Sequence, residues 1–151
     1  MQTQQRIIGE RTRSVNERSG ALAPGQLATV VVLGLVFWFA AAMAVRVGST
    51  AGFFGTSASA ITFAVAIPIC WLSVLCIKKV ARLATGQTLP GVAVGTMTAT
   101  FADGIALTWG RGLYGSDPVL TTLGAAWILW GVGLFLLFAY LLDDRLLGAT
   151  R

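Results

Sequence analysis

Four long apolar segments alternate with short polar ones along the chain. The apolar segments cover residues 27–45, 60–77, 91–109 and 119–142. A transmembrane helix needs about 20 mainly apolar residues to cross the hydrocarbon of a bilayer. Lipid leaves no water for unpaired backbone groups, and the segments are too long and too uniformly apolar for barrel strands, so each is expected to be a helix. The pattern predicts an all-α fold, an integral membrane bundle of four transmembrane helices within residues 23–146.

Composition favours the same class. Of the 151 residues, 56% are hydrophobic and 11% are charged, and the mean hydropathy is +0.77. Soluble domains carry about 25% charged residues. The chain is therefore predicted to be a single membrane domain.

Basic residues gather in the segments that four spans would place on one side of the membrane. These segments are a polar N-terminal tail (residues 1–22), the loop after the second span and a short C-terminal tail (residues 147–151) with the residues just before it. Their basic residues are Arg6, Arg11, Arg13, Arg18, Lys78, Lys79, Arg82, Arg145 and Arg151. Since short basic loops stay in the cytoplasm, both termini are predicted to be cytoplasmic. The net charge of +5 thus reflects topology and attraction to anionic lipid, and no nucleic-acid partner is expected.

The chemistry-bearing residues are few. The chain has no histidine, which excludes haem, copper and zinc sites built on imidazole. Cys70 and Cys76 are six positions apart on one predicted helix, about 240° around its axis, so they do not share a face. Phosphate-binding loops and nucleophile motifs are also missing from the sequence. We therefore predict no enzymatic activity, no metal and no cofactor, although a bound lipid or pigment is compatible with the composition.

Asp103 is the only carboxylate inside any of the four apolar segments. An Asp at the centre of a membrane helix costs roughly 2.5 to 3.5 kcal/mol, so it usually faces a partner, a cavity or a transported species. Thr96 and Thr100 precede it by seven and three positions and share its stripe of the helix. Two interpretations stay open. Asp103 either exchanges a proton along a polar path, or it is satisfied by hydrogen bonds between helices or by an arginine.

Two arginines are candidate charge partners of Asp103. Arg46 lies at the outer end of the first predicted span, and Arg111 follows Asp103 by two helical turns. Arg111 is about 12 Å away along the axis. Pairing between helices with Arg46 is therefore the easier geometry.

Glycines and tryptophans suggest packing features. Gly91 and Gly95 have the spacing that lets membrane helices approach closely, so they are expected to pack against another helix of the bundle. Four tryptophans lie deep in their spans rather than at the interface, where indoles are usual. They either line a site for an apolar, lipid-like or pigment-like ligand, or fill the interior and face lipid. These residues are Trp38, Trp71, Trp127 and Trp130.

Two segments resemble a known group of proteins. TFADGIALTW (residues 100–109) and GAAWILWGVG (residues 124–133) are similar to the second half of a bacterial family of small four-span inner-membrane proteins whose function is uncharacterised. The resemblance rests on the Asp-Gly of the third span and the aromatic-rich fourth span. It implies a compact protein of the bacterial inner (plasma) membrane, with Asp103 and Gly104 at the position of the family's acidic motif.

These observations lead to one functional prediction and one alternative. The lack of catalytic groups, the short loops and the arginine-rich tail favour an accessory or assembly subunit of a larger membrane complex. The alternative is a small proton-coupled transporter or channel that forms a homo-oligomer, in which Asp103 titrates and Thr96 and Thr100 line the path.

Overall fold

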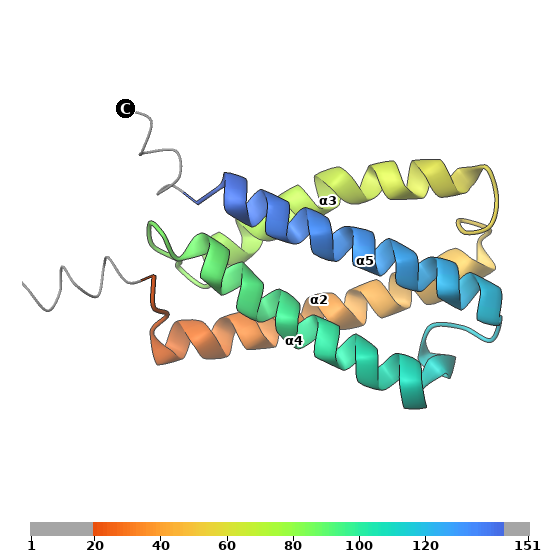
Figure 1. Cartoon of the computed structure of the whole chain (residues 1–151), viewed down its shortest axis with the longest axis horizontal. Helices are drawn as coiled ribbons and strands as arrows, with labels where there is room; N and C mark the ends of the chain where they lie inside the picture. The colour runs from red at the N-terminus through yellow and green to blue at the C-terminus, as the bar shows by residue number, and fades with distance from the viewer. Residues whose placement is uncertain (1–19, 144–151) are drawn as a thin grey trace, which may run out of the picture.

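The computed structural model of the protein describes residues 20–143, which form a helical bundle (Figure 1). Its elements are α2 (Pro24–Thr50), α3 (Ala58–Val80), α4 (Thr88–Trp109), the single turn η1 (Arg111–Leu113) and α5 (Pro118–Leu141). The predicted all-α fold is confirmed for this part of the chain, since each apolar segment coincides with one helix to within a few residues. The predicted tails, residues 1–22 and 147–151, lie almost entirely outside the described residues.

Successive helices run in opposite directions. The start of α2, the end of α3, the start of α4 and the end of α5 meet at one end of the bundle (Figure 1). We call this the basic end, because it holds Lys78, Lys79 and Arg82. The opposite end, called the far end, holds Arg46, η1 and the start of α5. Helix α2 packs mainly on α4, and α3 mainly on α5, whereas α2 and α3 barely touch. The bundle is thus two helix pairs that part on the α2–α3 side.

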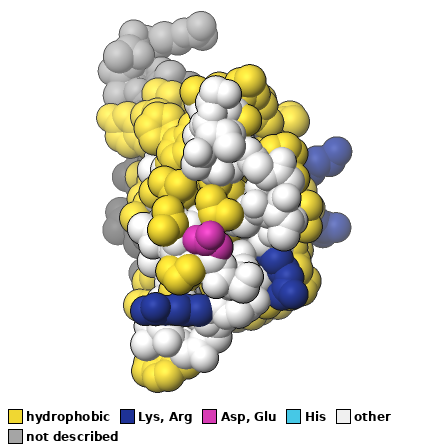
Figure 2. All heavy atoms as spheres, turned by 90° about the vertical axis from the view of Figure 1, so that its right-hand side faces the viewer, with side chains coloured by type: hydrophobic (Ala, Val, Ile, Leu, Met, Phe, Trp, Pro, Cys, Tyr) yellow, Lys and Arg dark blue, Asp and Glu magenta, His cyan; other side chains and the backbone are white. Residues whose placement is uncertain are grey.

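Three of the helices, α2, α3 and α5, are long and apolar enough to cross a membrane. The chain is therefore a helical membrane protein. Helix α4 is slightly shorter, with 22 residues, and it carries five threonines and Asp103 and falls outside that group. The outer surfaces of the helices are rich in exposed apolar side chains, including Val32, Leu72 and Leu129. Figure 2 shows that apolar side chains also surround the far end, where the basic side chains stand apart from one another. Such surfaces suit lipid rather than water.

Glycines bring α2 and α4 together. A Cβ atom on Gly34 would collide with the backbone of Gly95, and one on Gly95 would lie 3.1 Å from the carbonyl oxygen of Val30. The two helices therefore cross backbone to backbone, as small residues in membrane helices permit. Gly91 instead faces the side chain of Leu83 in the loop before α4.

A set of hydrogen bonds closes the basic end. The Gln26 amide donates to the Arg82 carbonyl (2.9 Å) and to Gln87 Oε1 (3.1 Å), which joins α2 to the loop between α3 and α4. The buried Asp143 carboxylate accepts from the backbone N–H of Leu89 (3.0 Å) in the first turn of α4. Side chains thus satisfy backbone groups that the helix termini leave free.

Candidate functional site

Three side chains from separate elements form a buried hydrogen-bond chain. The Tyr114 hydroxyl donates to Asp103 Oδ1, and the Trp38 indole N–H donates to the Tyr114 oxygen at 3.1 Å. Tyr114 is fully buried, and only 7% of Asp103 is exposed. We refer to Trp38, Tyr114 and Asp103 as the hydrogen-bond chain. It ties α2, α4 and the turn after η1 to one another.

The turn after α4 positions the phenol. Helix α4 ends at Trp109, and Gly110 leaves the helical conformation with φ −126° and ψ 35°. The following turn η1 is closed by a bond from the Tyr114 N–H to the Arg111 carbonyl at 3.0 Å. The chain therefore doubles back and sends the Tyr114 ring toward Asp103, eleven positions earlier.

The Tyr114 hydroxyl stays protonated. Burial raises the pKa of Tyr114 above its ordinary value, and the hydrogen bond to Asp103 raises this pKa further. A neutral phenol can donate to the carboxylate while accepting from the indole. The arrangement thus satisfies Asp103 with a neutral partner.

The arginines predicted as partners of Asp103 bond elsewhere. Arg46 Nη1 donates to the Gly112 carbonyl at 3.1 Å, and Arg111 Nε donates to the Leu107 carbonyl at 2.9 Å. Both side chains are exposed. The partner of Asp103 in the structure is a phenol and not a guanidinium, which avoids the cost of burying a second charge. No local pattern in the sequence indicates this contact, since Tyr114 lies in a loop.

A cavity of about 300 Å³ lies beside the hydrogen-bond chain. All four helices contribute to its wall, which is mostly apolar side chains and glycines, and both Asp103 and Thr96 line it. Thr100, predicted on the same polar stripe, is exposed and donates to the Thr96 carbonyl at 2.9 Å. It falls outside the wall because the lining arc of α4 is centred on Ala99, and the next position is about 100° around the helix.

The threonines of α4 do not form a continuous polar path. Thr98 and Thr108 donate back to the carbonyls of Val94 (2.9 Å) and Gly104 (2.7 Å) of their own helix. Such back-bonding satisfies a hydroxyl locally. The buried hydroxyl of Thr96 has no hydrogen-bond partner within residues 20–143.

The four deep tryptophans divide into two groups. Trp38 and Trp127 line the cavity, and Trp127 donates to the Thr62 carbonyl at 3.2 Å. Trp71 packs edge-on against Phe138 with ring centroids 5.2 Å apart, and Trp130 donates to the Phe63 carbonyl at 3.2 Å. These last two indoles lie on the partly exposed outer surface. The structure thus brings only the first pair to the site.

The described residues offer little for a metal or a redox centre. Within residues 20–143 no group of three or more histidine, cysteine or acidic side chains could hold a metal ion. The thiol of Cys70 lines the cavity 3.9 Å from the Gly131 carbonyl oxygen, while Cys76 is exposed on the outer surface. What the arrangement can do chemically is hold an apolar molecule next to a carboxylate.

No family model, no curated protein and no solved structure matches the chain. The fold and the site define a class, a small helical membrane protein with an internal apolar cavity.

Proposed function

We propose that the chain is a small non-enzymatic protein of the bacterial inner membrane that serves as an accessory or assembly subunit of a larger membrane complex. One observation carries the proposal. Asp103, the residue best suited to transport, is bonded to Tyr114 inside the bundle. A carboxylate held in this way joins α4 to the turn after it and, through Trp38, to α2. The resemblance to the uncharacterised four-span family supports the bacterial assignment.

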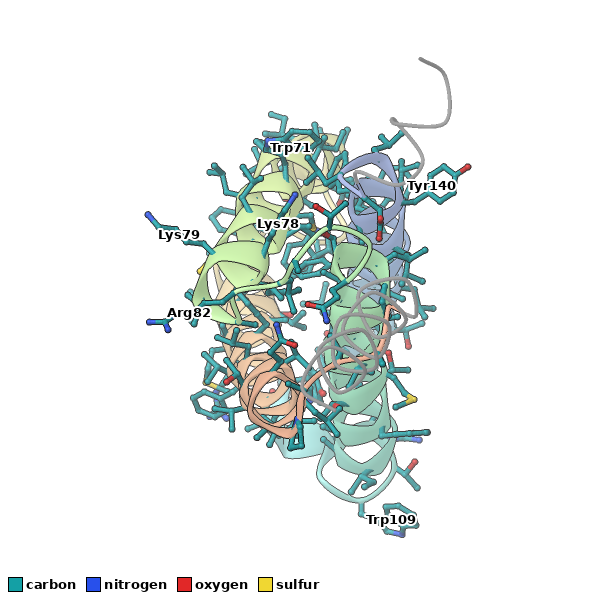
Figure 3. The ribbon with its side chains drawn as sticks, turned by 90° about the vertical axis from the view of Figure 1, so that its left-hand side faces the viewer. Trp71, Lys78, Lys79, Arg82, Trp109 and Tyr140 are labelled. Carbon is teal, nitrogen blue, oxygen red and sulfur yellow. The ribbon has the colours of Figure 1, made fainter. Side chains whose placement is uncertain are left out.

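The proposal includes four membrane spans. Helix α4 packs against α2 and α5 and runs between the same two ends of the bundle (Figure 1). Its 22 residues extend about 33 Å, enough for the hydrocarbon core. Trp109 and Tyr140 project outward from the bundle (Figure 3). They lie near the ends of α4 and α5, which are at opposite ends of the bundle, where interfacial aromatic residues are expected.

The proposed orientation places the basic end in the cytoplasm. Lys79 and Arg82 point away from the bundle at this end, whereas Lys78 reaches over it and donates to the Leu142 carbonyl at 3.4 Å (Figure 3). The far end carries the exposed basic residues Arg46 and Arg111 and also the exposed Asp117. The positive-inside rule then puts both chain termini in the cytoplasm, because both lead from the basic end.

The short loops within residues 20–143 support a role within a complex. The loops between helices comprise only residues 51–57, 81–87 and 110–117. They leave no room for a soluble domain between spans. Contacts with a partner would therefore be made by the apolar outer faces of the helices, by helix packing within the bilayer.

The test is a mild-detergent pull-down of the tagged chain from its native membrane. The chain is compared with Asp103→Asn and with Asp117→Asn, a matched change at an exposed site. We expect a larger complex in stoichiometric amount from all three, since an Asn at position 103 still accepts the Tyr114 hydrogen bond. Recovery of the chain alone, as a homo-oligomer, would contradict the proposal.

A second candidate is a small proton-coupled transporter or channel. It is favoured by one observation, that Asp103 and Thr96 line the same cavity. Against it stands Thr100, whose exposed side chain lies outside the cavity wall and donates to the Thr96 carbonyl. Flux driven by a pH gradient in liposomes, present in the native chain and lost in Asp103→Asn, would establish this function in place of the first.

A further inference from the structure

We propose that the cavity binds one single-chain lipid whose head group is a hydroxyl, that the lipid enters from the bilayer between α2 and α3, and that its hydroxyl donates a hydrogen bond to Asp103. This goes beyond the accessory role and does not rest on it. It requires only that the helices lie in a membrane.

The cavity opens sideways. Its wall includes Ala40 and Ala44 of α2 and Ile69 of α3, all of which are exposed on the outside of the bundle. Helices α2 and α3 barely touch. Because the two alanine side chains are small, the gap between α2 and α3 stays open. In a membrane this opening faces hydrocarbon, so the molecules that can reach it are those already dissolved in the bilayer.

The size and lining of the cavity fit one chain. Its volume of about 300 Å³ is at the lower end of small-molecule sites. It is about twice that of an engineered apolar cavity that takes up one benzene ring. Along α2 the wall extends from Gly34 to Ala44, about 15 Å. A space this long and narrow suits a single extended chain, packed against Phe37, Trp127 and Phe135.

The polar groups select the head group. Asp103 Oδ1 accepts from Tyr114, and a carboxylate can accept further bonds through Oδ2. The Trp38 N–H already donates to Tyr114, and the Tyr114 O–H already donates to Asp103. A ligand head that lies against Asp103 is therefore a hydrogen-bond donor.

Depth favours a neutral donor over a charged one. Asp103 lies six residues before the end of α4, about 9 Å below that end. An ammonium group at such a depth in hydrocarbon is costly. A hydroxyl carries no charge, and its hydrogen bond to Asp103 offsets the smaller cost of its burial. The unpartnered hydroxyl of Thr96, two turns further in, lies where the chain or a second hydroxyl of the ligand would pass.

The experiment uses the cavity tryptophans as reporters. Trp71, Trp109 and Trp130 are replaced by Phe, which leaves Trp38 and Trp127 in the full chain. The purified protein, in bilayers of unbrominated lipid, is titrated with bromine-terminated undecanol and with bromoundecane, whose bromine quenches a nearby indole. We expect saturable quenching by the alcohol at about tenfold lower concentration than by the alkane, a difference of about 1.4 kcal/mol. In Asp103→Asn we expect this difference to shrink.

Two glycines of α5 provide matched controls. A side chain at Gly131 enters the cavity, where the nearest heavy atom to a Cβ is Cys70 Sγ at 4.0 Å, whereas a Cβ at Gly133 meets open space on the outer surface. Gly131→Leu should abolish saturable quenching, and Gly133→Leu should leave it unchanged. Ala99→Leu fills the same cavity from α4 and serves if the first variant does not fold.

Some results would overturn the proposal. Quenching that rises without saturation and equally in all variants would show that the two indoles sense only bulk lipid. Equal affinity for the alcohol and the alkane would show that Asp103 does not accept a hydrogen bond from the ligand. Neither result bears on the pull-down, so failure of the lipid site and failure of the accessory role can be told apart.

Discussion

Asp103 lies among apolar side chains, and its hydrogen-bond partners determine the free-energy cost of burying its carboxylate. A buried carboxylate with no partner would destabilise the bundle by several kcal/mol. Tyr114 donates to it, and Trp38 in turn donates to Tyr114. The phenol thus bridges the indole of α2 and the carboxylate of α4 by two hydrogen bonds, and it adds no charge. At the scale of single residues, the stability of the site thus depends on one hydroxyl.

Removal of that hydroxyl should destabilise the protein. In Tyr114→Phe, Asp103 loses its donor and the Trp38 N–H loses its acceptor, at a cost of about 1–3 kcal/mol for a buried bond to a carboxylate. Thermal unfolding in detergent measures the loss. Tyr140→Phe changes the exposed tyrosine of α5 and should leave the melting temperature unchanged. Equal melting temperatures for both variants would exclude a structural role for the hydrogen-bond chain.

The same hydroxyl should make stability depend on alkaline pH. The pKa of Tyr114 is raised in the folded state, while an unfolded tyrosine ionises near about pH 10. Above that pH the unfolded chain loses the proton and the folded chain keeps it, so stability falls as pH rises. We expect the fall in melting temperature from about pH 9 to about pH 11 to be steeper in the native chain than in Tyr114→Phe. Parallel curves would contradict this linkage.

At the scale of helices, close backbone contact determines how α2 and α4 pack. Gly34 and Gly95 meet at their crossing, where a Cβ atom on Gly34 would collide with the backbone of Gly95. The crossing also places Trp38 one turn beyond Gly34 and Asp103 two turns beyond Gly95. The glycine contact therefore places the indole and the carboxylate on the same side of the crossing, toward the far end of the bundle.

Gly34→Ala should separate the two helices. We expect a loss of about 1–3 kcal/mol, the range for overpacking in a tight core, measured by thermal unfolding. Gly104→Ala is the control within α4, because a Cβ there meets nothing within 4 Å. It should be neutral or stabilising, since alanine favours a helix by about 1 kcal/mol over glycine. A stable Gly34→Ala would mean that the helices do not cross at these glycines.

At the scale of the whole molecule, the distribution of charge over the two ends decides orientation. The basic end carries Lys78, Lys79 and Arg82, and the far end carries Arg46, Arg111 and Asp117. The loop before α4 and the loop after it lie at opposite ends of the bundle (Figure 1). A label on each loop therefore reports both orientation and whether α4 crosses the membrane.

We expect the loops to be labelled from opposite sides. With Cys70 and Cys76 replaced by alanine, single cysteines are introduced as Thr85→Cys and Ser116→Cys, both at exposed positions. A membrane-impermeant maleimide added to spheroplasts should modify Ser116→Cys alone and, after lysis, both. The reverse pattern would invert the orientation. Modification of both before lysis would mean that α4 does not span.

The helices were predictable because apolar length is a property of each segment by itself. The four apolar segments correspond to helices α2 to α5. Asp103, the carboxylate predicted to need a partner or a cavity, is buried. Its partner was not predictable. Tyr114 reaches it only because Gly110 ends α4 and the chain turns back. No pattern of spacing distinguishes this phenol from the two arginines that were expected there.

Hydropathy and the order of charges along the chain are enough to specify a helical membrane protein, because lipid forces long apolar segments into helices whatever they pack against. The site required the fold. Which face of each helix turns inward depends on where glycines let backbones cross, so Thr96 lines the cavity while Thr100 faces outward. The cavity exists because α2 and α3 are held apart by contacts with α4 and α5, and such long-range packing is not encoded in the hydropathy of any one segment.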